Sequence, residues 1–122
     1  MKRISSGGAY EEKIGYSRAV MAGGIVYVSG CVGEGAGVKA QCAAASATIE
    51  RALAEAGSDF AHVVRVTYML PDATEFEPCW PLLRAAFGAT PPAATMIECG
   101  LIDPKYRIEI EVTAMLRDAA EG

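Results

Sequence analysis

Residues 106–116, with the sequence YRIEIEVTAML, alternate between apolar and polar side chains along most of their length. A two-residue period of this kind predicts a β-strand with one face toward a core and one face away from it. The apolar side chains expected on the core face are Ile108, Ile110, Val112 and Ala114. The side chains expected on the other face are Arg107, Glu109, Glu111 and Thr113. We therefore expect a sheet with helices on one face and a semi-polar second face that meets either water or another subunit.

Apolar and turn-forming patterns outside this strand predict the remaining elements. In chain order these are a hairpin of Tyr16–Met21 and Ile25–Ser29, a helix over Val38–Ala56, a strand over His62–Leu70, a helix over Pro78–Phe87 and a strand over Ala94–Cys99. Glycines supply the turns and stops, with Gly23 and Gly24 in the hairpin and Gly57 and Gly88 after the helices.

The order β-β-α-β-α-β-β predicts a single α+β domain over residues 1–122, with a mixed sheet and two helices on one face. Residues 1–13 are polar and rich in glycine and serine, which predicts a loose lead-in. In the strand over His62–Leu70, the alternation places Val64, Val66, Tyr68 and Leu70 on one face.

Composition favours a folded domain that associates with other subunits. The chain has 122 residues and is 52% hydrophobic, and spare apolar surface on a small domain is often covered by a partner. The net charge is −4 without any cluster of lysine and arginine, which argues against a nucleic-acid partner. We find no signal peptide and no window near 18 consecutive apolar residues, so we expect a cytoplasmic protein with no membrane partner.

The sequence lacks the motifs of several common sites, namely GxGxxG, GxxxxGK[ST], GxSxG and HExxH. His62 is the only histidine, so a zinc site would need mostly cysteine ligands. The four cysteines, which are Cys31, Cys42, Cys79 and Cys99, do not have the paired spacing of such a site. We expect no metal and four reduced thiols.

The polar face of the last strand carries the candidate chemistry that the residues themselves suggest. Glu109 and Glu111 share this face with Arg107, and paired carboxylates can do acid/base work when burial separates their pKa values. The alternative is a solvated face with cross-strand ion pairs, which the pattern alone favours. Cys31 follows a strand at a turn, where it is either an exposed thiol or a structural cysteine. The absence of a histidine placed to activate it favours the structural role.

A longer stretch around the last strand resembles a known family. Pro91–Val112, PPAATMIECGLIDPKYRIEIEV, is similar to the signature region of the Rid (reactive intermediate deaminase), or YjgF, family. Further similarities follow the same chain order, at IGYSRAV (Ile14–Val20), IVYVSGCVG (Ile25–Gly33) and VVRVTYML (Val63–Leu70).

The resemblance implies a chorismate-mutase-like fold and a homotrimer whose sheets form a central barrel. It also implies small-molecule clefts between the subunits. In those clefts, enzymes of the family hydrolyse enamines and imines such as 2-aminoacrylate to keto acids and ammonia. They use no metal and no organic cofactor.

Part of the family's site carries over to this chain. Its cleft tyrosine matches Tyr16, its serine–glycine pair matches Ser29 and Gly30, and its water-positioning glutamate matches Glu109. In the role that the resemblance implies, Tyr16 would orient the ligand and Glu109 would position or activate water. Backbone amides would hold an oxyanion, and those are the amides near Ser29, Gly30 and Thr95. Cys31 would line the cleft.

Other positions depart from the family pattern. Ala94 stands where the family has its substrate-binding arginine, Trp80 where it has an asparagine, and Met96 where it has a cysteine. The carboxylate anchor is therefore missing, as in arginine-lacking subgroups of the family. Arg18 is expected on the same strand face as Tyr16 and is the first candidate for a substitute anchor. Arg107 is a weaker one.

Three functions follow as hypotheses. The first is an enamine/imine deaminase, or a related hydrolase, of a specificity atypical for the family. The second is a metabolite-binding or regulatory module without turnover. The third is the endoribonuclease activity attached by name to some relatives, and the acidic charge counts against it.

Overall fold

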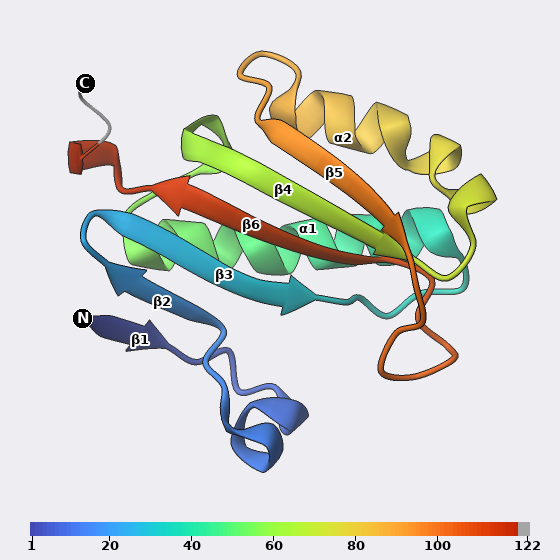
Figure 1. Ribbon diagram of the computed structural model, residues 1–122, viewed down its shortest axis with the longest axis horizontal. Coiled ribbons are helices and arrows are strands. Elements are labelled where there is room, and N and C mark those ends of the chain that lie inside the picture. The colour runs from blue at the N-terminus through green and yellow to red at the C-terminus, as the bar shows by residue number, and fades with distance from the viewer. Residues whose placement is uncertain (120–122) are drawn as a thin grey trace.

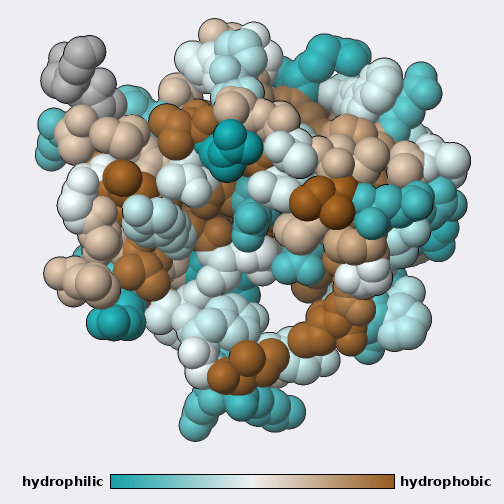
Figure 2. All heavy atoms as spheres, in the orientation of Figure 1, coloured by the Kyte–Doolittle hydropathy of each residue, from teal (hydrophilic) through white to brown (hydrophobic). Residues whose placement is uncertain are grey.

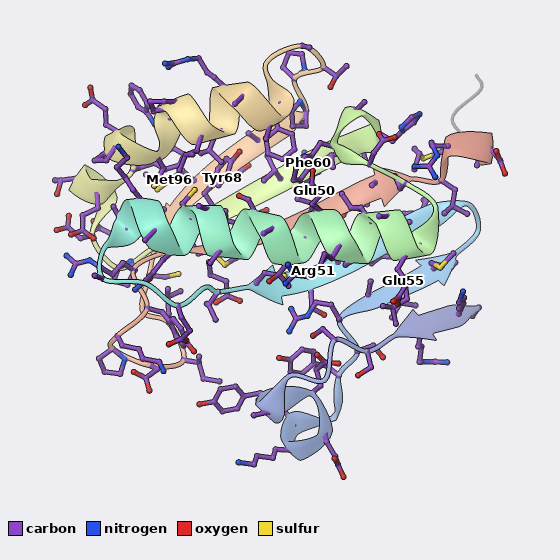
Figure 3. All side chains as sticks on the ribbon, turned by 180° about the vertical axis from the view of Figure 1, so that it is seen from behind. Glu50, Arg51, Glu55, Phe60, Tyr68 and Met96 are labelled. Atoms are coloured by element: carbon purple, nitrogen blue, oxygen red, sulfur yellow. The ribbon has the colours of Figure 1, made fainter. Side chains whose placement is uncertain are left out.

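The computed structural model describes residues 1–119, and a six-stranded mixed sheet with the order β1-β2-β3-β6-β4-β5 forms its centre (Figure 1). The strands are β1 (Lys2–Ile4), β2 (Ala19–Ala22), β3 (Ile25–Cys31), β4 (Val63–Leu70), β5 (Ala93–Glu98) and β6 (Glu109–Met115). Only β4 and β5 run parallel. The two main helices, α1 (Val38–Ala56) and α2 (Trp80–Phe87), cover the same face of the sheet (Figure 3). The predicted α+β class is confirmed.

The core lies between the two helices and this face of the sheet. The alternation of the last strand is confirmed, because Ile110 and Val112 are buried whereas Glu109 and Glu111 remain partly or largely exposed. The buried side chains of α1 recur at three- and four-residue steps and include Cys42, Ala45, Ile49 and Leu53. The helix ends at Gly57, whose φ of +93° is in the left-handed region that favours glycine.

The N-terminal segment is more ordered than the sequence predicts. Residues 2–4 form β1, an edge strand that pairs antiparallel with β2, and Ile4 is buried in the core. Glu11–Gly15 form a π-helical turn, so the prediction of a loose lead-in over residues 1–13 is wrong. The strand predicted from Tyr16 begins only at Ala19. A polar three-residue strand carries too little periodicity to be recognised in a sequence.

Smaller corrections occur in the second half of the chain. Val64 is 47% exposed instead of facing the core, because a register shift between Val63 and Arg65 interrupts the alternation. The last strand begins at Glu109, three residues after its predicted start. The second helix begins at Trp80, after a short 3-10 turn, where Pro78 was expected to open it.

Within residues 1–119, no helix covers the other face of the sheet, which exposes large apolar side chains. Tyr27 is 48% and Ile97 45% exposed, and apolar patches are visible on this face in Figure 2. All six residues of β5 are exposed, and this strand pairs only with β4 within residues 1–119. An open edge of this kind is a template for pairing with another chain. Over the same residues, no helix is both long and apolar enough to cross a membrane.

The thiols of the buried cysteines are expected to stay reduced. Cys31, Cys42, Cys79 and Cys99 are free in the structure. Burial raises the pKa of Cys79 to about 12, so its reactive thiolate form is rare. We predict equal melting temperatures with and without reductant. A fall of several degrees on reduction would contradict this prediction, because loss of a native disulfide costs about 2–5 kcal/mol.

Candidate functional site

A cavity of about 540 Å³ opens where β3 ends, between the N-terminal segment and the loop from β5 to β6. The molecule is visibly hollowed at this place (Figure 2). This volume is in the range of small-molecule sites. Seven of the residues singled out in the sequence line it: Tyr16, Arg18, Ser29, Gly30, Cys31, Glu109 and Glu111.

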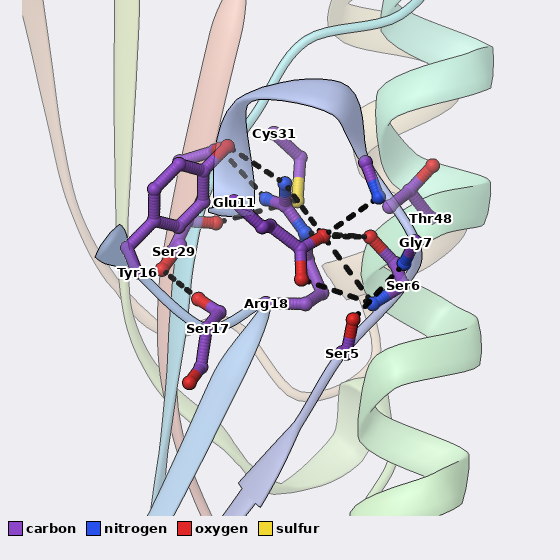
Figure 4. Close-up of polar contacts among 12 residues, drawn as sticks. Ser5, Ser6, Gly7, Glu11, Tyr16, Ser17, Arg18, Ser29, Cys31 and Thr48 are labelled. Atoms are coloured by element: carbon purple, nitrogen blue, oxygen red, sulfur yellow. Dashed lines mark hydrogen bonds and ion pairs between the residues drawn. The ribbon is translucent and has the colours of Figure 1, made fainter. Parts of the chain in front are cut away.

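Arg18 is the polar centre of the cavity wall and is only 7% exposed (Figure 4). Its Nη1 donates to the carbonyl oxygen of Gly30 at 2.9 Å and to Cys31 Sγ at 3.2 Å. Its Nε donates to Ser6 Oγ at 3.3 Å, and its Nη2 donates to Tyr16 Oη at 3.3 Å. Nη2 also lies 3.7 Å from a carboxylate oxygen of Glu11. A guanidinium has five N–H donors, so the four hydrogen bonds use most of its donor capacity, and the ion pair with Glu11 adds a further contact.

Glu11 fastens the N-terminal segment over the cavity. Its carboxylate accepts hydrogen bonds from the backbone amides of Ser6 at 3.2 Å and Gly8 at 3.1 Å, and from the Ser6 hydroxyl. Burial alone would raise the pKa of Glu11, but these hydrogen bonds outweigh it and hold the pKa below its usual value. The turn that follows brings Tyr10 and Ile14 to the rim of the cavity. Sequence reasoning missed Glu11, because nothing in a polar lead-in marks one glutamate as buried.

Loss of the Glu11 charge is expected to free this segment. The depressed pKa means that the stabilisation is present above the ordinary value of 4.5 and is lost as the pH falls through the lower value in the folded state. In Glu11→Gln, amide hydrogen exchange at residues 5–15 should rise by about tenfold or more, since charge-assisted bonds are lost. Glu12→Gln is the matched control, because Glu12 is exposed. Equal exchange in the two variants would contradict this account.

Glu109 and Gly30 are fitted to each other. A Cβ atom built on Gly30 would lie 2.0 Å from Glu109 Oε2, so only glycine leaves room for the carboxylate in its present position. Burial raises the pKa of Glu109, and the neighbouring carboxylate of Glu111 raises it further, whereas Arg18 opposes them. A carboxyl group whose pKa moves toward neutrality can both accept and donate a proton in one reaction.

Ser29 and Cys31 are hydrogen-bonded within the cavity wall. The Ser29 hydroxyl donates to the carbonyl oxygen of Ser17 at 2.7 Å, which ties β3 to the segment before β2. Burial raises the pKa of the Cys31 thiol, and the nearby Arg18 opposes this only in part. The thiol donates instead to the Ser29 carbonyl oxygen at 3.3 Å. The structural role that the sequence favoured for Cys31 agrees with these contacts.

Trp80 and Ala94 lie away from this cavity. Both line a second cavity of about 340 Å³ between α2 and β5. Ala94 pairs in register with Val66, which is fully buried, so Ala94 faces α2. Thr95 pairs with Thr67 and faces the uncovered side. Because β5 is at the opposite edge of the sheet from β1 and β2, one chain does not bring the predicted site residues together.

Two other sequence candidates are engaged elsewhere. Arg107 forms an ion pair with Glu75, with Nε donating to Oε1 at 2.8 Å, so it does not reach Glu109. His62 Nδ1 lies 2.7 Å from Asp59 Oδ1 at the start of β4. In the part of the chain that the structure describes, no group of three or more His, Cys, Asp or Glu side chains is arranged to hold a metal ion.

Several known proteins are similar to this chain in fold and in sequence. The structure of Rv2704 from Mycobacterium tuberculosis, a member of the YjgF/YER057c/UK114 family, is 37% identical with a TM-score of 0.90, over 93% of this chain and 98% of that one. NMB1025 from Neisseria meningitidis, also of the YjgF family, is 34% identical with a TM-score of 0.84, over 96% of both chains. Human 2-iminobutanoate/2-iminopropanoate deaminase is 29% identical over 82% of this chain and 79% of its own. The family model described as Endoribonuclease L-PSP matches residues 8–116. The chain therefore belongs to the YjgF/Rid family.

Proposed function

We propose that this protein is a hydrolytic deaminase of enamines or imines whose specificity is atypical for its family. The observation that carries the proposal is the placement of Glu109, half-buried over Gly30 in the cavity that Arg18 and Tyr16 also line. Curated relatives at about 29% identity are named as deaminases of imino acids, which is consistent with this chemistry.

Hydrolysis of an imine needs one group that moves a proton twice. The Glu109 carboxylate takes a proton from water as the oxygen forms a bond to the imine carbon. The resulting carboxyl group then returns the proton to nitrogen, which gives a carbinolamine. The carboxylate next takes the carbinolamine hydroxyl proton and delivers it to the amine nitrogen, so that the carbonyl forms as the carbon–nitrogen bond breaks and ammonia leaves. An enamine enters the same route after its terminal carbon takes up a proton and its nitrogen loses one, which gives the imine. The raised pKa of Glu109 suits both steps.

Tyr16 and Arg18 have separate roles in this proposal. Tyr16 Oη accepts a hydrogen bond from Arg18, so the phenol proton is free to donate to a ligand. Arg18 acts as a positioning residue, because its donors are already engaged by the protein. It is therefore a poor substitute for the missing carboxylate anchor, and we place this chain among the arginine-lacking members of the family.

We further propose a cyclic homotrimer with the clefts between its subunits. The candidate site residues are divided between the β2-β3-β6 part of the sheet and its β5 edge, and head-to-tail association of copies is an arrangement that joins the two groups. The exposed β5 edge and the apolar residues of the uncovered face, including Tyr27 and Ile97, support burial by other copies. Light scattering that shows a stable monomer at micromolar concentration would contradict this assembly.

A screen of imines and enamines, with ammonia release as the readout, tests the proposed activity. We expect turnover of substrates without a carboxylate, and little turnover of 2-aminoacrylate-type imines. Binding without ammonia release from any substrate would instead favour a metabolite-binding module. Endoribonuclease activity is disfavoured by the net charge of −4, because RNA binding depends on neutralising phosphates.

A further inference from the structure

The second cavity differs in character from the one that holds Glu109. It is a groove between α2 and β5, and its walls are almost entirely apolar. The lining residues are Val66, Tyr68, Phe76, Trp80, Leu83, Arg84, Phe87, Gly88, Pro91, Pro92 and Ala94. At about 340 Å³ it is at the small end of ligand sites, and its size suits a ring and a short substituent.

The walls of the groove are built from aromatic side chains that already contact each other. The ring centroids of Tyr68 and Phe76 lie 5.0 Å apart, and those of Phe76 and Trp80 lie 6.2 Å apart at an interplanar angle of 88°. Edge and tilted geometries of this kind leave ring faces and edges available for a further ring. Trp80 remains 45% exposed, so the single chain does not fill the groove.

Ala94 makes the groove apolar. It faces α2 from the same register row as the buried Val66, at the position where the family has its carboxylate-binding arginine. A methyl group there leaves open space and supplies no charge. Ala94 is also exposed in the chain, so a ligand that enters the groove can reach it.

Charge in the groove restricts the ligand further. Among the described residues that line it, Arg84 is the only charged one and none is acidic. Burial raises the pKa of Tyr68 to about 12, so its hydroxyl stays neutral at physiological pH. A cationic ligand would therefore meet only repulsion, whereas neutral and anionic ligands would not.

We propose that this groove binds the aromatic ring of a small molecule that carries no positive charge. The inference rests on the proposed function and deepens it, because it names the substrate class as aryl-substituted imines or enamines in which the ring occupies the position of the family's carboxylate. In the proposed trimer the ring lies in the groove of one copy and the reacting carbon lies in the Glu109 cavity of the next.

Trp80 is the only tryptophan of the chain, so its fluorescence reports directly on the groove. Phenylacetamide and acetamide form a neutral pair of probes that differ by the ring. Titrated into the wild-type protein, phenylacetamide should change the Trp80 emission and protect it from quenching by acrylamide, with an affinity at least about tenfold higher than that of acetamide. An emission that neither probe changes, or that acrylamide never reaches because a second copy fills the groove, would overturn the inference.

Two variants at Ala94 locate the binding. Ala94→Arg and Ala94→Leu should both weaken phenylacetamide binding by about tenfold or more, since each side chain occupies the groove. Ala85→Arg, at an exposed α2 position that does not line the groove, should leave the affinity unchanged. Loss of binding in Ala85→Arg as well, or retained binding in both Ala94 variants, would overturn the inference.

Failure of the aromatic-binding proposal can be distinguished from failure of the proposed deaminase activity. Glu109→Gln should still bind phenylacetamide with the wild-type affinity, because Glu109 lies outside the groove. Unchanged Trp80 emission together with Glu109-dependent ammonia release from aliphatic imines would refute the aromatic site alone. Phenylacetamide binding without ammonia release from any imine would uphold the groove and refute the activity.

Discussion

Ala94→Arg is expected to raise the turnover of carboxylate-bearing imines by roughly 30-fold to several thousand-fold over the wild type. An arginine there would grip the carboxylate through two parallel charge-assisted hydrogen bonds, which an alanine cannot form. A buried charge pair with one partner removed loses about 2–5 kcal/mol, and each 1.4 kcal/mol is about tenfold. Ammonia release from 2-aminoacrylate or its homologues, measured as kcat/KM, is the readout.

Two controls test whether the expected gain in turnover comes from an arginine side chain at position 94. Ala94→Lys supplies the positive charge without the planar guanidinium group, so it should recover much less turnover of carboxylate-bearing imines than Ala94→Arg. The Arg18 donors are engaged by Ser6, Gly30 and other neighbours, so the wild type should have little activity of this kind. Brisk wild-type turnover of carboxylate imines that survives Arg18→Ala would show that the account of the missing anchor is wrong.

Gly30→Ala is expected to lower turnover about as much as loss of the general base, by roughly 10²–10⁴-fold. The new Cβ would stand 2.0 Å from Glu109 Oε2, so the carboxylate must leave its place over the cavity floor. The end of a flexible side chain can move cheaply, so the melting temperature should change little. Gly37→Ala is the matched control, because a Cβ on Gly37 would meet nothing within 4 Å. Equal activity of Gly30→Ala and Gly37→Ala would contradict the claim that the close packing of Gly30 positions the Glu109 carboxylate.

The sequence predicted the elements that have a strong local period. The alternation around Ile110 and Val112 and the three- and four-residue steps of Val38–Ala56 reflect burial on one side, so their structure was predictable. The structure of residues whose burial depends on contacts distant in the sequence was not predictable. Residues 2–4 form β1 because they pair with the edge of β2. Val64 faces outward because of a register shift, which the alternation of the sequence does not predict.

The sequence named candidate site residues that the structure divides between two cavities. Tyr16, Gly30 and Glu109 line one cavity, whereas Trp80 and Ala94 line the other. The distance in the sheet between Glu109 and Ala94 depends on the strand order β3-β6-β4-β5, which no local pattern encodes. Glu11 was missed for a similar reason, because its partner Arg18 and its role at the cavity appear only when the segment folds back over β3.

The measurement that tests the central claim most directly is a comparison of turnover and ligand binding in wild type and Glu109→Gln, using the best substrate from the imine screen. We predict that ammonia release falls by roughly 10²–10⁴-fold while the dissociation constant stays within a few-fold, because the amide keeps the shape of the side chain but cannot carry the proton. Glu50→Gln, on the exposed face of α1, should behave as wild type. Turnover retained in Glu109→Gln would contradict the claim that Glu109 carries the reaction.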